Sequence, residues 1–175
     1  TGFIIFGLKT WDKAMNVEIS ESTKIIEIYG QGLGKWGWTA RYAGNDNTLG
    51  KANYKLVKGK NTLGVDMLDV NSADDKMARE VHLVVDKPVL LKFRSQDVIH
   101  SAFLPHFRVQ MNCVPGMVTQ FGFTPTKTTE EMRKDPKVIK QMNEINSIRL
   151  AKGKSEEEFE YILLCNKICG EGHYN

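Results

Sequence analysis

The sequence predicts a mainly β domain that a helical insertion interrupts before the last strand. Two observations carry this prediction. Several short segments alternate apolar and polar residues with a period of two, and turn residues separate these segments. One later segment, residues 128–153, instead repeats apolar residues at helical spacing. Short strands with frequent turns are typical of a β-sandwich or barrel, so we expect a single domain of that class.

Composition narrows the possible functions. The chain of 175 residues has 41% hydrophobic and 26% charged residues, as an ordinary globular domain does. A formal net charge of +3 without a block of Lys and Arg gives no support to nucleic-acid binding. Three cysteines are too few for a disulfide scaffold. No basic stretch precedes a long apolar run and a cleavage site, so no signal peptide is predicted.

The N-terminal segment, residues 2–8, is apolar. It is far too short to cross a bilayer by itself, because a spanning helix takes about 20 residues. Two interpretations stay open: a buried first strand, or the end of a membrane helix. Trp11 follows directly, and a tryptophan there suits an anchor at the membrane interface.

The next segments predict strands in order along the chain. Residues 23–29 are rich in β-branched side chains and end at Gly30. After a turn at residues 31–34, a second strand has one aromatic face, made of Trp36, Trp38, Ala40 and Tyr42. The polar region up to residue 79 predicts a solvated loop or an acidic docking patch for a basic partner, with Asp66, Asp69, Asp74 and Asp75.

From residue 81 the sequence again shows patterns typical of β-strands. Strands are expected at residues 81–85, 89–93, 107–111 and 118–123, with a turn at residues 115–116. His100 is expected in a polar loop. Of the other candidates, we expect His82, His106 and Cys113 to be structural or surface residues rather than ligands.

The helical insertion carries explicit start and stop signals. Thr128 and Glu131 have the spacing of a capping box, and Asp135 with Pro136 offers an N-cap and a first-turn proline. Gly153 is suited to end the helical segment. A final strand at residues 159–164 then leads directly into Cys165.

Cys165, Cys169 and His173 form the densest chemical motif of the chain, since they lie within nine positions. Thiolates and imidazoles suit copper, zinc or iron rather than hard cations. Gly170 and Gly172 allow the backbone to turn so that the three side chains can point at one centre. The two cysteines could also form a disulfide, but a pair of metal ligands is the better interpretation.

Four motifs, in the same order, resemble the copper-bearing periplasmic domain of subunit II of haem–copper (cytochrome c) oxidases. The family pattern C-x-E-x-C-G-x-x-H-x-x-M is matched by residues 165–173, up to the histidine. The family's D-V-x-H-S segment is matched by residues 97–101, which read D-V-I-H-S. Residues 105–116 match its proline-to-Pro-Gly segment, and residues 36–42 match its W-x-W-x-x-x-Y strand.

The resemblance implies a cupredoxin-like Greek-key sandwich or barrel, tethered by two N-terminal membrane helices. Residues 1–8 would be the end of the second helix, and residues 9–175 the domain, with its helical insertion near residues 128–154. Its cofactor would be the dinuclear copper centre Cu-A. Carried over, Cys165 and Cys169 bridge the coppers, His100 and His173 bind one copper each, and the Lys167 carbonyl is a weak ligand.

The function implied by the resemblance is electron transfer within a terminal oxidase. The chain would accept electrons from a cytochrome c or an equivalent donor, with Trp36 as the residue where they enter, and pass them to the haem of subunit I. It would be held at the cell membrane with its soluble domain on the periplasmic side. Lys167 and Asn112 depart from the family pattern, and Lys167 replaces a glutamate that helps to bind a magnesium or manganese ion.

Two other functions are compatible with the same residues. A copper chaperone or thiol-redox protein also uses a Cys-x-x-x-Cys pair with a histidine, but it places this pair early in a thioredoxin-like chain. A structural zinc site is the other alternative, because zinc accepts two cysteines and two histidines.

Overall fold

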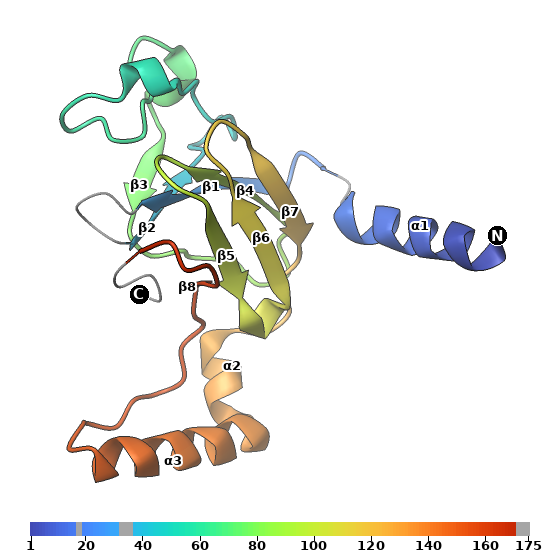
Figure 1. The fold of residues 1–175 in the computed structure, drawn as a ribbon, viewed down its shortest axis with the longest axis vertical. Helices are drawn as coiled ribbons and strands as arrows, with labels where there is room; N and C mark the ends of the chain where they lie inside the picture. Colours follow the sequence, from blue (N-terminus) through green and yellow to red (C-terminus); the bar gives the residue numbers. More distant parts are fainter. Residues whose placement is uncertain (17–18, 32–36, 171–175) are drawn as a thin grey trace.

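Eight β-strands form two sheets around a common core in the part of the chain that the structure describes (Figure 1). This structure is a computed structural model, and it describes residues 1–16, 19–31 and 37–170. The larger sheet has the order β3-β2-β1-β4-β7, and the smaller has the order β6-β5-β8. The predicted mainly β, two-sheet fold with a helical insertion is confirmed. The strands are β1 (Lys24–Gln31), β2 (Gly37–Tyr42), β3 (Lys76–Ala78), β4 (Val89–Ser95), β5 (His100–Leu104), β6 (Val109–Cys113), β7 (Thr119–Phe123) and β8 (Leu164–Cys165), and the 3-10 helices are η1 (Tyr54–Leu56), η2 (Val70–Ser72) and η3 (Pro105–Phe107).

The core lies between the sheets, and strand alternation builds it. Ile26 and Ile28 project from the same face of β1, and both are buried. β1 pairs in parallel with β4, whose Phe93 is also buried, and Leu104 of β5 closes the core from the smaller sheet. Burying one such side chain contributes about 1.5–3 kcal/mol. This packing fixes the strand ends on which the candidate site is built.

A second layer covers the outer face of β1 and β2. Arg41 lies there between two carboxylates, with Nη2 2.6 Å from Glu27 Oε2 and Nη1 3.3 Å from Asp75 Oδ2. Tyr29 packs on the same face with Leu63. The expectation of a solvated loop is therefore wrong for Asp75, because the segment between β2 and β3 folds back and buries this carboxylate beside Arg41.

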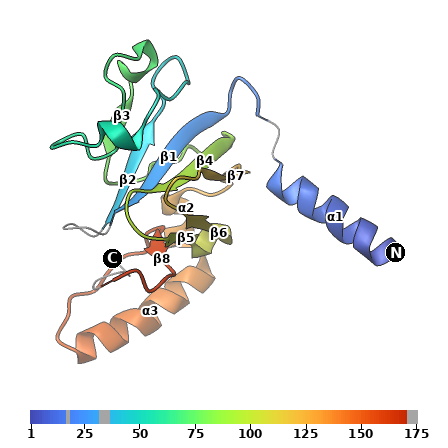
Figure 2. The same ribbon diagram turned by 45° about the horizontal axis from the view of Figure 1, so that its top comes forward.

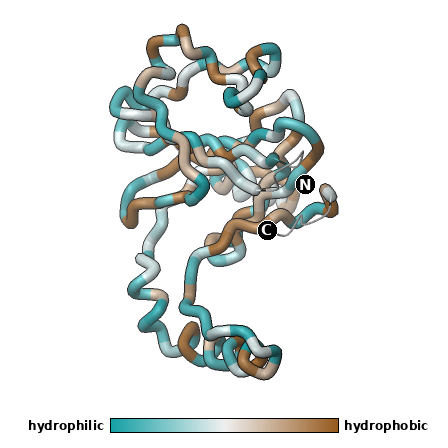
Figure 3. The backbone as a smooth tube through the Cα atoms, turned by 90° about the vertical axis from the view of Figure 1, so that its left-hand side faces the viewer, coloured by the Kyte–Doolittle hydropathy of each residue, from teal (hydrophilic) through white to brown (hydrophobic). Residues whose placement is uncertain are grey.

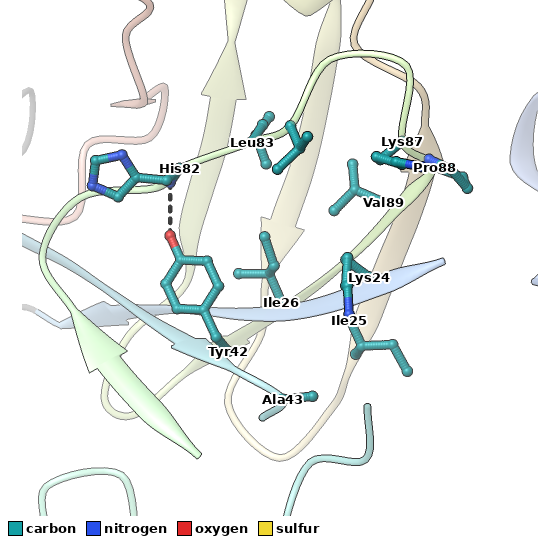
Figure 4. Close-up of a pocket in the computed structure, with 11 residues that line it drawn as sticks. Lys24, Ile25, Ile26, Tyr42, Ala43, His82, Leu83, Lys87, Pro88 and Val89 are labelled. Atoms are coloured by element: carbon teal, nitrogen blue, oxygen red, sulfur yellow. Dashed lines mark hydrogen bonds between the residues drawn. The ribbon is translucent and has the colours of Figure 1, made fainter. Parts of the chain in front are cut away.

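The strand predicted at residues 81–85 is wrong. Leu83 packs against the core, but the residues are not in a strand. Backbone groups just before Leu83 form hydrogen bonds with a side chain and not with a neighbouring strand. The Tyr42 hydroxyl donates to the Glu80 carbonyl at 3.0 Å and accepts from the His82 amide at 2.7 Å. Figure 4 shows the bond to His82. The phenol therefore takes up the His82 amide, a backbone group that a strand would have paired, and the Glu80 carbonyl just before the predicted strand.

Two further predictions near the site are corrected by the structure. His100 begins β5 instead of lying in a loop. This strand escaped prediction because only one of its three inward residues, Leu104, is large and apolar; the other two are His100 and Ala102. The period-two pattern of apolar residues is therefore weak. The strand predicted at residues 159–164 is reduced to β8, and at its predicted start the Phe159 carbonyl accepts a hydrogen bond from Arg133 Nε at 3.1 Å.

The predicted helical insertion is confirmed as two helices, α2 (Thr129–Lys134) and α3 (Pro136–Ala151), which extend away from the sheets in Figure 1. In the turned view of Figure 2, α3 again lies outside the sheets. Thr128 and Glu131 form a capping box, and the Asp135 side chain accepts a hydrogen bond from the Lys137 amide. Gly153, at a φ of 70°, follows the end of α3 as a left-handed cap residue. We call residues 128–160, the two helices and the returning chain, the helical arm; Figure 3 shows hydrophilic and hydrophobic positions alternating around its longer helix.

The N-terminal segment is a helix, α1 (Gly2–Met15), that projects from the body (Figure 1). The alternative of a buried first strand is therefore wrong, since Phe3 is 90% exposed and the helix contains no buried residue. The helix continues beyond residue 8, up to Met15. Among the described residues, no helix combines the length and the apolar character needed to cross a membrane.

Candidate metal centre

Sulfur and nitrogen donors meet where the C-terminal segment passes the start of β5. The Cys165 Sγ lies 4.0 Å from His100 Nδ1 and 3.4 Å from Cys169 Sγ. The donor atoms of the three residues all lie within 4.8 Å of one another, a spacing suited to one metal centre. Within the described residues, this is the one group of His, Cys, Asp and Glu side chains with such spacing. Folding thus joins segments that are 65 residues apart in the chain.

Sheet pairing explains how Cys165 reaches His100. β8 pairs with β5 so that Cys165 lies opposite Ala102, and the Asn166 amide extends the ladder by donating to the Ser101 carbonyl at 2.9 Å. Paired residues project from the same face of a sheet, and so do residues two apart on one strand. Cys165 and His100 therefore share the inner face of the smaller sheet.

Cys113 lies on the other side of His100. It is paired with His100 across β5 and β6, and its side chain is completely buried. Burial raises the pKa of the Cys113 thiol to about 12, so it is neutral over the physiological pH range. The prediction that Cys113 is a small buried residue is confirmed.

Asp97, Trp38 and Gly30 also lie around the His100 imidazole. Its Nε2 lies 2.8 Å from Asp97 Oδ1, and both side chains are only 3% exposed. With the proton on Nε2 donated to Asp97, the Nδ1 lone pair is left directed towards the sulfurs. The Trp38 ring lies edge-on to the imidazole, with centroids 6.1 Å apart. Gly30 lies against the remaining side of the ring.

The loop after Cys165 brings a carbonyl oxygen to the centre. The Lys167 carbonyl lies 3.5 Å from the Cys165 Sγ, while Ile168 beside it is 93% exposed. Burial, followed by the nearby Cys165 thiol, raises the pKa of Cys169 to about 11. A metal that binds two thiolates here must therefore displace thiol protons.

The structure brings together His100, Cys165 and Cys169, with the Lys167 carbonyl beside them. Trp36 and His173, the other two residues predicted for the site, lie outside the described residues. Sequence reasoning missed the roles of Asp97 and Gly30 around His100. Asp97 stood in the D-V-I-H-S motif three residues before the histidine, which is a usable signal for a hydrogen-bond partner.

Two other features lie away from this centre. A pocket of about 240 Å³, shown in Figure 4, is lined by Lys24 and Val89 at the starts of β1 and β4, whereas the centre adjoins the opposite end of β1. His82 is exposed beside Glu80, and His106 packs edge-on against Phe159. Neither histidine belongs to the group of three donors.

The donor chemistry defines a class of protein: a β-sandwich with a centre suited to a soft or borderline metal. Two thiols, an imidazole and a carbonyl fit copper, and the described residues of the site provide none of the carboxylate cage that a hard cation needs. A search of protein families matches residues 26–131 to the family described as "Cytochrome C oxidase subunit II, periplasmic domain". The chain belongs to the cytochrome c oxidase subunit II family.

A relative found by sequence agrees with this assignment. The chain is 36% identical over 170 residues to the alternative cytochrome c oxidase subunit 2 of Bradyrhizobium diazoefficiens; the match covers 96% of this chain and 49% of the relative. The chain thus spans about half the length of that relative. Among solved structures, it is similar to the periplasmic domain of cytochrome oxidase subunit II (CoxB) of Bradyrhizobium japonicum, at 20% identity and a TM-score of 0.43, covering 89% of this chain and 80% of the other. It is also similar to a chain in the structure of a mixed disulfide intermediate between the thioredoxin-like TlpA and cytochrome c oxidase subunit II, at 22% identity and a TM-score of 0.38. This match covers 65% of this chain and 69% of the other.

Proposed function

We propose that this chain is the electron-transfer subunit of a haem–copper terminal oxidase. It takes electrons from a cytochrome c at a dinuclear copper centre and passes them to the haem of subunit I. The observation that carries the proposal is the convergence of His100, Cys165 and Cys169 within 4.8 Å, in a chain of the subunit II family.

The proposed ligand roles follow the positions of the donor atoms. Cys165 and Cys169 would hold the copper pair between them through both thiolates, since their sulfurs lie side by side at 3.4 Å. His100 binds through Nδ1, because Nε2 is engaged by Asp97. His173 supplies the second imidazole, and the Lys167 carbonyl is a weak ligand. When bound, a copper pair shared by two thiolates supplies a one-electron carrier whose geometry changes little on reduction.

The residues around the centre serve this role by limiting motion. β5 and β8 hold His100 and Cys165 in a hydrogen-bonded sheet, and buried Phe93 and Ala102 belong to the core that supports it. Ligands held in this way need little rearrangement when the charge of the centre changes. The bond from His100 to Asp97 fixes the orientation of the ring and increases its basicity as a ligand.

The proposal includes an assembly at the membrane. The soluble domain lies on the periplasmic side, docks with subunit I, and is anchored through its N-terminal region, of which residues 1–8 are the end of a membrane helix. The exposed apolar side chains of α1, including Phe3 and Phe6, and Trp11 near its end support an anchor of this kind.

We also propose that Trp36 is the residue where electrons enter from the cytochrome. Trp36→Ala should then slow reduction of the loaded centre several-fold while weakening cytochrome binding much less, because docking depends on charge and on a wider apolar contact. Stopped-flow reduction and a binding titration on the same variant measure the two effects. An unchanged reduction rate would show that electrons enter through another residue.

Substitution of the cysteines tests the dinuclear centre. The chain is loaded with copper, and the copper content per chain and the electron paramagnetic resonance spectrum are recorded. We expect two coppers and a mixed-valence spectrum in the wild type, and loss of that spectrum in Cys165→Ser and Cys169→Ser, because one thiolate cannot bridge the pair in the same way.

Cys113→Ser is the matched control, since Cys113 is buried next to the centre but is not one of the three grouped donors. It should lose stability yet keep the mixed-valence spectrum. A wild type that takes up a single metal without this spectrum, as a structural zinc site would, contradicts the proposal.

A second candidate is a copper chaperone or thiol-redox protein, and the 3.4 Å contact between Cys165 and Cys169 favours it. Such a pair can close to a disulfide, giving two electrons and two protons to a thiol–disulfide partner. The position of the pair at the end of a β-sheet is unlike the strand-to-helix junction that this class uses. Loss of copper to an apo-acceptor within minutes, with no electron exchange with a cytochrome, would support this candidate instead.

A further inference from the structure

We infer that Gly30 is a positioning residue of the metal centre, because its missing side chain leaves the slot that the His100 imidazole occupies. The inference rests on the proposed function, since it concerns how one ligand of that centre is oriented. Its main observation is steric and does not require the metal.

Strand alternation shows where a side chain at position 30 would point. Ile26 and Ile28 of β1 project into the core, and Gly30 is the next residue on this face. A Cβ atom built on Gly30 would lie 2.7 Å from His100 Cδ2 and 2.8 Å from His100 Cγ. Both are atoms of the ring and not the end of a flexible chain, so an alanine requires the ring or the backbone to move.

The backbone of Gly30 has little freedom to retreat. It lies in the middle of the larger sheet, paired with Trp38 of β2 on one side and with Ser95 of β4 on the other. It is not one of the glycines with positive φ, and its conformation is that of a strand. Alanine is therefore acceptable to the backbone, and the three heavy atoms nearest to its Cβ would all belong to His100.

The imidazole is confined on its other sides as well. Asp97 bonds to Nε2 at 2.8 Å from a carboxylate that is 3% exposed, and the Trp38 ring stands edge-on 6.1 Å away. A displaced ring must therefore stretch its bond to Asp97, change its contact with Trp38, or turn Nδ1 away from Cys165. Each of these movements disturbs the metal centre more than the fold.

The test compares Gly30→Ala with a matched glycine substitution. Gly50→Ala is the control, because its Cβ would collide with Ser72 Oγ in the segment that covers the outer face of the larger sheet. We expect both variants to lose stability. Gly30→Ala alone should lower copper affinity by about tenfold or more and replace the mixed-valence spectrum by that of a single copper, whereas Gly50→Ala keeps the wild-type spectrum. A wild-type spectrum and affinity in folded Gly30→Ala would overturn the inference.

A measurement on the metal-free chain keeps the inference independent of the cofactor. In a double-mutant cycle of unfolding, Gly30→Ala should destabilise the wild type but have almost no effect in a His100→Gly background, because the clashing ring is gone. Equal destabilisation in both backgrounds would refute the steric role of Gly30, even if the Gly30→Ala single variant folds poorly. If the wild type fails to form a dinuclear centre while this coupling is found, the proposed function fails and the contact between Gly30 and His100 stands.

Discussion

The metal-centre end of the sandwich and the helical arm are held together by different kinds of contact. At the centre, His100 and Cys165 lie on strands whose inner faces join a core of fully buried side chains such as Phe93. In the arm, neither α2 nor α3 contains a buried residue. The difference teaches that the geometry of the centre is set by packing that excludes water, whereas the arm depends on bonds for which water competes.

The contacts of the arm show this dependence directly. The Asn146 side chain makes two hydrogen bonds with the Glu157 backbone, each at 3.0 Å, and both groups are exposed. Arg149 Nε donates to the Ser155 carbonyl at 2.8 Å. Each of these bonds contributes only about 0.5–1.5 kcal/mol net, because water can replace either partner. The arm is therefore a weakly coupled unit attached to a strongly coupled body.

Substituting one arginine in the body and one in the arm tests this difference, and Arg41 in the body gives the largest expected loss of stability. Its side chain is 2% exposed, and it pairs with Glu27 and Asp75, which are 4% and 2% exposed. Arg41→Met leaves the buried Asp75 carboxylate without this cation and leaves Glu27 paired with Arg94 alone. Removing one partner of a buried ion pair typically costs about 3–5 kcal/mol. Urea unfolding of the metal-free chain measures the loss. A loss below about 1 kcal/mol would show that the body tolerates uncompensated charge and is looser than proposed.

The matched change in the arm is Arg133→Met. Arg133 also pairs with several carboxylates, including Glu130 and Glu158, but its side chain is 28% exposed and theirs are 71% and 77% exposed. Water screens such pairs, so we expect a loss of about 1 kcal/mol or less, with copper binding unchanged. If this variant loses as much stability as Arg41→Met, the arm unfolds together with the sandwich and the proposed division is wrong.

The same division explains what could be predicted from the sequence. The signals of the arm are local: Thr128 with Glu131 and Asp135 with Pro136 state where its helices begin, and Gly153 states where the second ends. A short stretch of chain is enough to satisfy the backbone at these helix ends. The helical insertion was therefore predicted with its boundaries close to those observed.

Without the family resemblance, the residues of the centre could be predicted only as a set of residue types. Cys165, Cys169 and His100 stood out by their chemistry, but their approach depends on the pairing of β5 with β8, which no local pattern encodes. The same applies to Gly30, whose importance lies in a contact with a residue 70 positions later in the chain. The false strand at residues 81–85 also involves a distant partner, because the Tyr42 hydroxyl accepts the His82 amide hydrogen bond.

The smallest expected effect concerns His106, which lies where the arm joins the body. Its ring packs edge-on against Phe159, with centroids 4.9 Å apart, and against Tyr161 at 5.5 Å. Burial lowers the pKa of His106 below its ordinary value, so the folded chain favours the neutral ring. The stability that His106 contributes is therefore fully present above the pKa of the unfolded chain, about 6.5, and is lost as the pH falls below it. Thermal unfolding between pH 7.5 and pH 5.5 should show a decline that is partly removed in His106→Gln and retained in His82→Gln, the exposed control. Equal pH dependence in wild type and His106→Gln would show that the junction does not sense this proton, and that the aromatic contact tolerates a charged ring.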